Sequence, residues 1–288
     1  SLTEETKTAV LASANQLTAV SAERVRDELG KILCTPAPAE GVKLLDQLNL
    51  LTAVLPELSA PSTVSHMIAT LRWLVILEGL CLGQKPKDVT FQKLANQFGQ
   101  HQAQWAAYWQ RSAGGDLNGR LLLRFGGMLQ EVYNIDAGAI GRQLVFSKAA
   151  VSYLETIVAG RTNLMPLLDE PLPLSRRTIY CYFRDTQGAG LDIILLTLAR
   201  YFAAFNGTGS DSMHARIQSI TDSLLTHYFT HYEQTISPPP LLDGNQQIKA
   251  IHLKPGKEIG RLLAIIQEAQ AAGDISTAQE AIELARRQ

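Results

Sequence analysis

The feature that most constrains this 288-residue sequence is an apolar period close to one α-helical turn, which recurs along nearly its whole length. Apolar side chains spaced at i, i+3 or i+4 and i+7 share one face of a helix and predict that this face is buried. The spacing is seen in three separated sets: Val10, Ala14, Leu17; Ile68, Leu71, Val75; and Ile194, Leu195, Leu198, Phe202. No run alternates apolar and polar residues as a half-buried strand would. The sequence therefore predicts an all-α fold.

Proline and asparagine residues mark where these helices stop. A helix that begins after Ser21, a candidate N-cap, is expected to end at 35–38, where the sequence reads Thr-Pro-Ala-Pro. Asn49 tolerates the left-handed conformation that ends the next helix. Two proline-rich stretches, Pro56–Ser65 and Ser237–Pro240, are predicted boundaries, and the triple proline is expected to be stiff and extended. The sequence thus predicts three parts, residues 1–58, 59–236 and 237–288.

Composition and charge narrow the class of protein. A hydrophobic content of 46% and a charged content of 18% are those of an ordinary soluble globular protein. The formal net charge is −1, so any binding of nucleic acid depends on local basic patches. The three cysteines are far apart and form no Cys-x-x-Cys pair, which predicts reduced thiols in the cytoplasm. Uncharged apolar stretches such as 193–199 are too short to cross a bilayer, so we expect no membrane partner.

Residues 21–29, Ser-Ala-Glu-Arg-Val-Arg-Asp-Glu-Leu, followed by Ile-Leu at 32–33, resemble the neck of class II tRNA nucleotidyltransferases and bacterial poly(A) polymerases. The Pro-Glu-Leu at 56–58 is similar to the end of that family's following helix. The resemblance implies that Glu23, Arg24 and Glu28 brace the neck, and it makes Arg24 and Arg26 candidates for RNA binding. Arg24 and Glu28 are also i, i+4 neighbours that can form an ion pair on a solvated helix face.

Residues 176–186, Arg-Arg-Thr-Ile-Tyr-Cys-Tyr-Phe-Arg-Asp-Thr, resemble the body of family members that carry an inserted HD-type domain. The resemblance implies a helical, HD-like body over residues 59–236. Arg176 and Arg177 are candidates for phosphate contacts. The aromatic residues between the arginines, Tyr180, Tyr182 and Phe183, are interpreted as core side chains rather than as stacking platforms for bases.

Residues 239–288 resemble the helical tail of the same family, with Leu-Lys-Pro-Gly-Lys-Glu-Ile-Gly-Arg-Leu-Leu at 253–263. A Pro-Gly step opens a helix there, and the unpaired N–H groups of a helix N-terminus suit an anion. The cations around this step are candidates for contacts with an RNA backbone: Lys249, Lys254, Lys257 and Arg261. The three matched stretches occur in the order that the family has them.

The residues that add nucleotides in this family are absent from the sequence. Its catalytic head holds Mg²⁺ and ATP or CTP with a Gly-Ser followed by an Asp-x-Asp pair, and no Asp-x-Asp occurs here. Gly209-Ser210-Asp211 lacks the second carboxylate. Because the match begins partway into the neck, we expect the parent protein to have a head upstream. We therefore expect no cofactor in this chain and no polymerisation by the chain alone.

The HD-like middle part raises the possibility of a second kind of enzyme. HD phosphohydrolases hold a metal with His, His-Asp and Asp residues. His66 falls where the first histidine would lie, but the His-Asp position reads Arg124-Phe125, so His66 is a remnant of such a site at most. His227 and His231, at i and i+4, can share one zinc ion only if a third ligand converges with them. The sequence predicts an HD-like shell without a metal.

Three functions stay open from the sequence. The first and favoured one is a module that grips a tRNA or another RNA 3′ region for a nucleotidyltransferase head, by shape and phosphate contacts. The second is a divergent HD phosphohydrolase that acts on a nucleotide. The third is a helical interaction scaffold with no role in RNA binding, which would instead present an apolar patch to a partner.

Overall fold

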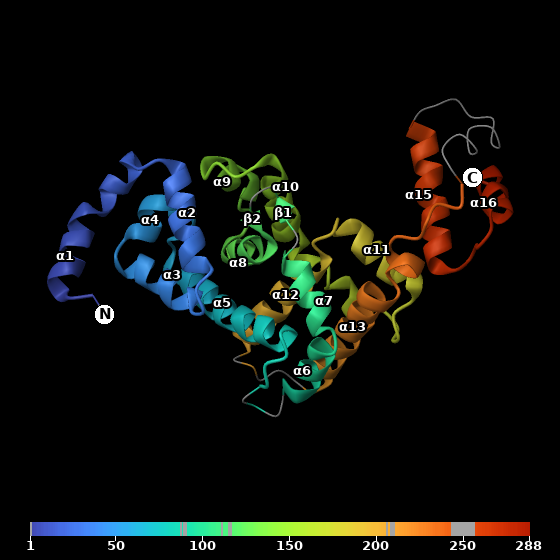
Figure 1. Ribbon diagram of the computed structural model, residues 1–288, viewed down its shortest axis with the longest axis horizontal. Helices are drawn as coiled ribbons and strands as arrows, with labels where there is room; N and C mark the ends of the chain where they lie inside the picture. The colour runs from blue at the N-terminus through green and yellow to red at the C-terminus, as the bar shows by residue number, and fades with distance from the viewer. Residues whose placement is uncertain are drawn as a thin grey trace. The chain divides into compact units, whose positions relative to one another are not determined.

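The computed structural model of the protein describes residues 2–86, 88, 91–110, 112–114, 117–205, 207, 211–242 and 257–288 (Figure 1). Helices make up almost all of the regular structure in these ranges, so the predicted all-α fold is confirmed. The contacts divide the chain into two compact units. Unit 1 comprises Ser1–Leu164 with Leu191–Met213, and unit 2 comprises Met165–Gly190 with His214–Gln288.

Unit 1 holds most of the helices. In chain order its elements are α1 (Glu4–Ser13), η1 (Ala14–Ala19), α2 (Ala22–Leu33), α3 (Pro38–Gln47), α4 (Leu50–Val54), η2 (Pro56–Leu58), α5 (Pro61–Cys81), α6 (Gln92–Gly99), α7 (Gln102–Gln110), β1 (Ser112–Gly114), β2 (Leu117–Asn118), α8 (Gly119–Leu129), α9 (Ala137–Gln143), α10 (Lys148–Ala159), η4 (Gly160–Thr162) and α12 (Gly190–Ala204). The two strands pair antiparallel, with Ser112 opposite Asn118. They are too short to carry an alternating pattern in the sequence.

The punctuation residues of the first helices act as predicted. Helix α2 ends at Leu33, and Pro38 occupies the first turn of α3, where its missing N–H costs no hydrogen bond. Asn49 has a φ of 58° in the left-handed region and separates α3 from α4. Ser21 takes the N-cap position of α2, but its side chain makes no capping hydrogen bond.

One apolar core holds unit 1 together. Leu33, Leu58, Met67 and Leu122, from α2, η2, α5 and α8, are completely excluded from solvent and belong to one cluster. Leu58 and Met67 lie on either side of the boundary expected between residues 58 and 59. The three-part organisation stays a prediction, and the contacts place its first part in the same compact unit as most of the second.

Helix α5 runs through this core. It spans 21 residues and is, by length and composition, the one helix of the described chain that is long and apolar enough to cross a membrane. Of its apolar window, 56% is buried inside the protein, which is the pattern of a core helix. Buried side chains recur along it, among them Val64, Leu71, Leu74 and Leu77.

A glycine lets α8 approach α10. A Cβ placed at Gly126 would lie 2.5 Å from Cγ2 of Ile157, which is closer than real Cβ atoms come to their neighbours. The sequence Gly-Arg-Leu-Leu-Leu-Arg-Phe-Gly-Gly-Met-Leu of α8 is buried almost throughout, so the helix is the central element of unit 1. This central position matters because α8 also carries Arg124.

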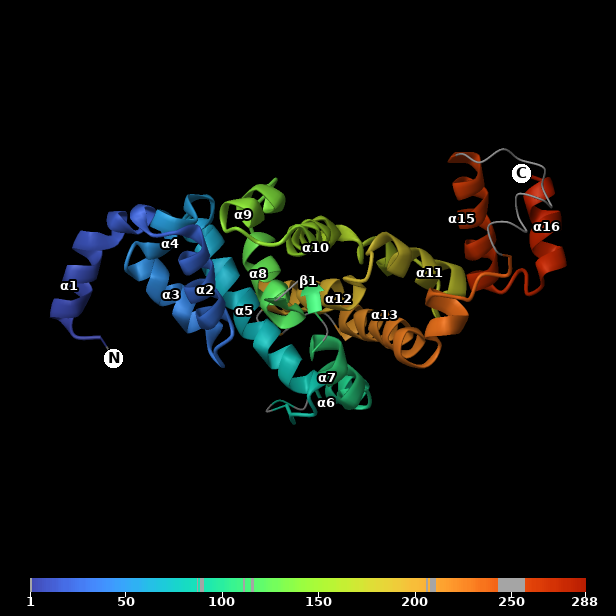
Figure 2. The same ribbon diagram turned by 45° about the horizontal axis from the view of Figure 1, so that its top comes forward.

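Unit 2 is built from η5 (Pro166–Leu168), α11 (Arg176–Asp185), most of α13 (Asp211–Thr230), the π-helical turn η6 (Tyr232–Ile236), α15 (Lys257–Ala272) and α16 (Ala278–Arg286). Helices α15 and α16 pack side by side, as both Figure 1 and Figure 2 show. Leu242, Ile266, Ala281 and Ala285 form their shared core. Helix α16 begins with a capping box, in which Thr277 and Glu280 exchange hydrogen bonds with each other's backbone N–H groups.

Candidate nucleic-acid interface

The predicted neck stretch forms helix α2, and its apolar and charged residues separate cleanly. Leu29 and Leu33 are buried, and Val25 packs against the same core. Glu23 lies in the first turn and Lys31 in the last, where each complements the helix dipole. The charged side chains of α2 therefore face outward, where a ligand can reach them.

A groove of about 550 Å³ lies beside α2, between η1, α3 and α4, and we call it the neck groove. Its floor is apolar and its rim is charged. The lining residues are Leu17, Val20, Arg24, Val25, Asp27, Glu28, Leu29, Lys31, Ile32, Leu45, Leu50, Leu51 and Val54. Two of the three residues of the expected neck motif, Arg24 and Glu28, thus lie on this rim, whereas Glu23 is exposed outside it.

The ion pair that the spacing of Arg24 and Glu28 allowed is not formed. Glu28 instead accepts a hydrogen bond from Lys31, at 2.7 Å, and the two form an exposed pair at i, i+3. Lys31 lies three residues after Glu28 and Arg24 four residues before it, and the carboxylate pairs with Lys31. Arg24 has no ion-pair partner among the described residues, so its charge is available at the rim.

Arg26 has a different role from Arg24. Its guanidinium pairs with Asp27 at 2.9 Å and donates a hydrogen bond of 2.7 Å to the backbone carbonyl of Val145. Val145 is a non-glycine residue with a φ of 53°. These contacts fix α2 against the segment after α9, and they leave Arg26 fewer donors for a phosphate than Arg24 has.

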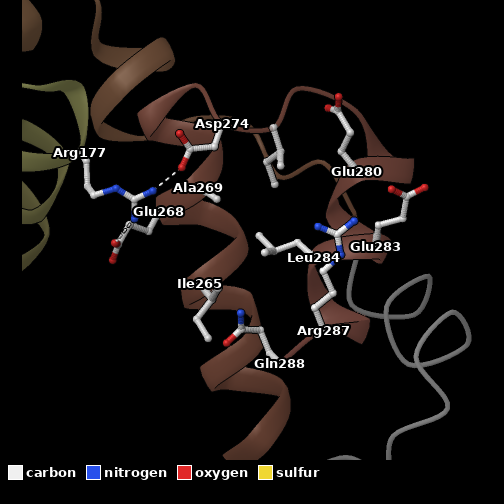
Figure 3. A pocket seen from close by; sticks show the side chains of 11 residues that line it. Arg177, Ile265, Glu268, Ala269, Asp274, Glu280, Glu283, Leu284, Arg287 and Gln288 are labelled. Atoms are coloured by element: carbon white, nitrogen blue, oxygen red, sulfur yellow. Dashed lines mark hydrogen bonds and ion pairs between the residues drawn. The ribbon is translucent and has the colours of Figure 1, made fainter.

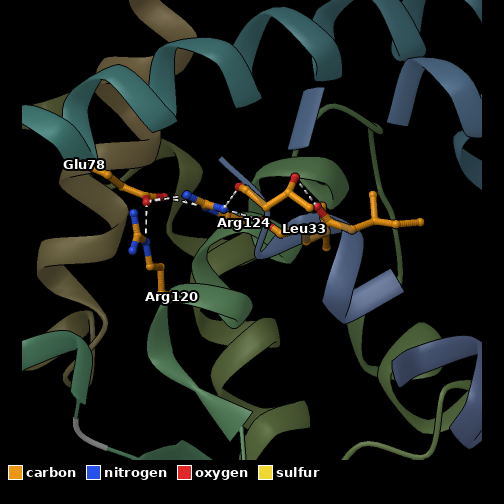
Figure 4. A network of polar contacts seen from close by, with 6 residues as sticks. Leu33, Glu78, Arg120 and Arg124 are labelled. Carbon is orange, nitrogen blue, oxygen red and sulfur yellow. Dashed lines mark hydrogen bonds and ion pairs between the residues drawn. The ribbon is translucent and has the colours of Figure 1, made fainter. Parts of the chain in front are cut away.

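Arg124, compared above with the His-Asp position of HD enzymes, is a buried arginine. Arg124 on α8 makes two hydrogen bonds to the Glu78 carboxylate, at 2.8 and 2.7 Å (Figure 4). Its remaining nitrogen donates to the backbone carbonyls of Leu33 and Thr35 at 2.5 and 2.8 Å. Arg120 adds a second cation to the same carboxylate at 2.5 Å. The guanidinium therefore satisfies carbonyls that the end of α2 leaves without partners.

The histidines that were considered as metal ligands do not converge with others. His66 is exposed on α5, and its role as a remnant stays a prediction. His227 directs Nδ1 to the carbonyl of Ser223 at 2.8 Å, and its ring centroid lies 5.4 Å from that of His231. In the part of the chain that the structure describes, no three His, Cys, Asp or Glu side chains come together in a way that could hold a metal ion.

Arg177 and Arg184 of α11 are engaged with carboxylates, chiefly Glu268 of α15. Arg177 pairs with Glu268 at 2.6 Å and also with Asp274, as Figure 3 shows. Arg184 pairs with Asp185 and with Glu268, both at 2.8 Å. The hydrogen bond to Glu268 raises the pKa of Arg177, and the one to Asp185 raises the pKa of Arg184, so both stay charged. Their charges are balanced inside unit 2.

Arg176 and the aromatic residues of α11 also have structural partners. Arg176 donates a hydrogen bond of 2.7 Å to the carbonyl of Gln234 in η6. Tyr180, Tyr182 and Phe183 are buried, as expected of core aromatics. The geometry of α11 is thus that of a packed helix, and its arginines are not a free phosphate-binding row.

The predicted tail cations are only partly visible. Lys249 and Lys254 lie outside the described residues, as does the Lys257 side chain at the first position of α15. Arg261 is half exposed and pairs with Glu258 at 2.9 Å. The expected anion site at the Pro-Gly step, residues 255–256, lies outside the described residues as well.

Two features of unit 1 were not singled out from the sequence. One is the buried Glu78–Arg124 pair, for which charged residues inside the apolar helices α5 and α8 were the available signal. The other is Tyr133, an aromatic residue that is 79% exposed, with the guanidinium of Arg161 5.3 Å from its ring centroid. No sequence signal marks that pair, because it depends on two segments meeting in space.

The sequence of the chain matches one protein family and several curated proteins. Residues 1–60, which include the whole neck groove, match the family described as "Probable RNA and SrmB- binding site of polymerase A". Over 90% of its length the chain is 25% identical to an A-adding tRNA nucleotidyltransferase of Deinococcus radiodurans, covering 56% of that protein. It is also 25% identical, over 90% of its length, to a CC-adding tRNA nucleotidyltransferase of Thermus thermophilus, covering 55% of that protein.

A third relative matches a shorter part of the chain. It is a CC-adding tRNA nucleotidyltransferase of Synechocystis, 28% identical over 50% of this chain and 31% of its own length. The chain therefore spans about half the length, or less, of the curated relatives that it matches.

Proposed function

Because the chain is a member of the tRNA nucleotidyltransferase family, we propose that it is a module that grips the 3′ region of a tRNA and does not itself add nucleotides. The neck groove carries the proposal. It lies within the residues that match the RNA-binding family, and Arg24 stands on its rim without an ion pair among the described residues. A guanidinium placed in this way can donate two hydrogen bonds to one phosphate.

The proposed grip depends on shape and on phosphates. Folded RNA is recognised mainly through its backbone, because side chains cannot read the deep, narrow groove of an A-form helix. In our proposal Arg24 contacts the backbone from the neck, and the tail cations Lys249, Lys254 and Lys257 contact it from a second place. The net charge of −1 then requires that these local contacts supply the binding energy.

We further propose that nucleotide addition, with Mg²⁺ and ATP or CTP, belongs to another part of the parent protein. The sequence contains no Asp-x-Asp pair that could hold the metal ions. The helical body is proposed to be an HD-like shell without a metal, with the Arg124 network in the place of the ligands. Incubating the chain with tRNA, Mg²⁺, ATP and CTP should leave the length of the tRNA unchanged.

The experiment that tests the grip is a binding series with labelled tRNA, tRNA lacking its 3′ end, and a DNA hairpin at several salt concentrations. We expect binding that prefers intact tRNA and weakens steeply with salt. The change Arg24→Ala should lower the slope of log affinity against log salt by about one, the value for one lost phosphate contact. Arg72→Ala is the matched control, because Arg72 is also exposed but is paired with Glu40. No detectable tRNA binding at low salt would contradict the proposal.

A second function, docking of a protein, is favoured by the apolar floor of the neck groove. The family description names SrmB as well as RNA. Val20 lines the groove and is 40% exposed, so Val20→Glu changes the groove without burying a charge. If the groove docks purified SrmB, this substitution should abolish the complex and leave tRNA binding in place. The opposite pattern would favour RNA as the occupant.

A further inference from the structure

Tyr133 presents an open aromatic face on the surface of unit 1. It lies in the segment between α8 and α9 and is 79% exposed, more than any other large hydrophobic side chain of the described chain. The next residue, Asn134, has a φ of 56°, a left-handed conformation that asparagine tolerates and that turns the chain sharply. Covering such an exposed ring with a flat apolar partner removes apolar surface from water and is therefore favourable.

An arginine lies against the same ring. Arg161, in η4 at the end of α10, has its guanidinium carbon 5.3 Å from the Tyr133 ring centroid, which is the geometry of a cation–π contact. Its one hydrogen bond is a long one, 3.4 Å, to the carbonyl of Val132. No carboxylate pairs with Arg161 among the described residues. Most of its donors are therefore unused.

A hollow of about 590 Å³ lies beside this pair. Its lining mixes polar and apolar residues: Asn134, Asp136, Glu155, Arg161 and Thr162 contribute polar side chains, between Ile135, Ala137, Gly138, Val158 and Ala159. Arg142 lies 3.8 Å from Asp136 and 3.6 Å from Glu155, so those two carboxylates have a cation of their own. Arg161 forms no ion pair with either of them in the described chain.

We propose that Tyr133 and Arg161 form a stacking site for one unpaired base of an RNA strand. The base covers the open face of the tyrosine ring, and Arg161 donates to a phosphate oxygen of the same strand. This is the combination by which proteins bind single-stranded nucleic acid: an aromatic platform beside a cation. The inference rests on the proposed RNA grip and adds to it a place for nucleotides that are not base-paired.

The surroundings favour a nucleotide over a protein partner. A protein interface buries an aromatic anchor inside an apolar patch. The hollow beside Tyr133 instead places amide, hydroxyl, carboxylate and guanidinium groups among its apolar residues, so a polar ligand finds hydrogen-bond partners there. Paired RNA cannot use the site, because the faces of its bases are covered by their neighbours in the stack. The Tyr133–Arg161 site should therefore prefer unpaired nucleotides, whereas the neck groove, which is proposed to contact the RNA backbone, should show no such preference.

The test measures fluorescence anisotropy with a labelled single-stranded oligoadenylate and with a blunt-ended RNA duplex. We expect Tyr133→Ala to weaken binding of the oligoadenylate about tenfold, since alanine substitution of a stacked aromatic costs roughly 1–3 kcal/mol per base. Tyr133→Phe keeps the ring and should bind the oligoadenylate as tightly as the unsubstituted chain does. Neither change should affect binding of the duplex. Because the side chain is exposed, melting curves should show that all variants are folded.

A matched pair of arginine variants separates the site from net charge. Arg161→Ala and Arg142→Ala remove the same charge from the same surface, but only Arg161 contacts the tyrosine ring. Arg161→Ala should weaken oligoadenylate binding several times more than Arg142→Ala does.

Each other outcome has a definite meaning. If tRNA binds with a steep salt dependence and Tyr133→Ala binds the oligoadenylate as tightly as the parent, the stacking site is wrong and the RNA grip stands. An equal loss of duplex binding in Tyr133→Ala would also overturn the site, because a base platform acts on unpaired strands only. If the unsubstituted chain binds none of the RNAs, the proposed RNA grip and the stacking site are both wrong.

Discussion

Arg124 and Glu78 form a bidentate ion pair that is almost completely closed to solvent, with 2% of the arginine side chain and 0% of the glutamate side chain exposed. The same guanidinium holds the carbonyls of Leu33 and Thr35 at the end of α2. One buried side chain thus connects the helix that carries the neck motif with α5 and α8. It fixes where the neck groove lies within unit 1, because α2 forms one wall of that groove.

Replacing Arg124 with methionine should be strongly destabilising. The change leaves the Glu78 carboxylate buried with only Arg120 as a partner and leaves two backbone carbonyls unsatisfied. Breaking a buried ion pair from one side costs about 3–5 kcal/mol. We expect a loss of this size in the free energy of unfolding of unit 1, measured by urea denaturation.

The partner Arg120 provides the control for that change. Its side chain is 40% exposed, and Arg124 still pairs with the buried carboxylate when Arg120 is removed, so Arg120→Met should cost clearly less than Arg124→Met. Replacing Arg124 and Glu78 together by apolar residues should restore part of the loss, because no buried charge is left unpaired. An Arg124→Met protein as stable as the parent would show that the pair does not hold the neck.

Adding one methyl group at Gly126 should also destabilise unit 1. The new Cβ would meet Ile157 at 2.5 Å, and overpacking of a filled core costs about 1–3 kcal/mol. Gly260→Ala is the matched control, since it makes the same change inside α15 with nothing within 4 Å of the new Cβ. That control should raise stability by about 0.5–1 kcal/mol through helix propensity. Thermal unfolding of both variants is the measurement, and equal shifts would contradict the close approach of α8 and α10.

Unit 2 should lose stability in acid through Glu280. Hydrogen bonds from the backbone N–H groups of Ser276 and Thr277 lower the pKa of this carboxyl below its ordinary value of 4.5. A group whose pKa is lowered by folding stabilises the folded state above its ordinary pKa, and this contribution is lost as the pH falls through the lowered pKa. Melting temperatures measured from neutral pH to about pH 3 should fall less steeply in Glu280→Gln, which cannot titrate.

The hydroxyl of Thr277 supplies the control for that titration. Thr277→Ala removes the other half of the capping box, which costs about 1 kcal/mol, and a hydroxyl does not titrate in this range. Its destabilisation should therefore be present already at neutral pH. A parent and a Glu280→Gln protein with the same pH profile would contradict the role of the carboxylate.

The sequence predicted the features of this fold that local physics determines. The helical period predicted the all-α class, and the prolines of residues 35–38 and Asn49 predicted where α2 and α3 end, because each acts on its own backbone. The partners of Arg124 could not be found in this way. Glu78 is 46 positions away and Leu33 is 91 positions away, and only the packing of α2, α5 and α8 brings them together.

In the candidate site, too, the sequence did not determine which ion pairs form. The spacing of Arg24 and Glu28 permitted an ion pair, but Lys31 lies as close to the same carboxylate, and spacing alone does not choose between two competitors. Arg177 was a candidate for phosphate binding because its charge was visible in the sequence. The two carboxylates that engage it, Glu268 of α15 and Asp274 just after that helix, lie more than 90 residues later in the sequence.

That engagement leads to a prediction about RNA binding. Glu268 balances both Arg177 and Arg184, so Glu268→Gln removes one charge and leaves two guanidinium groups of α11 with weaker partners. If those arginines can reach RNA, the slope of log tRNA affinity against log salt should become steeper by about one to two. Glu283→Gln is the matched control: Glu268 and Glu283 line one pocket between α15 and α16 (Figure 3), so the charge change is the same, but Glu283 pairs with no arginine in the described chain. Equal slopes for the two variants would mean that α11 does not face the RNA and that its arginines serve only to hold α15.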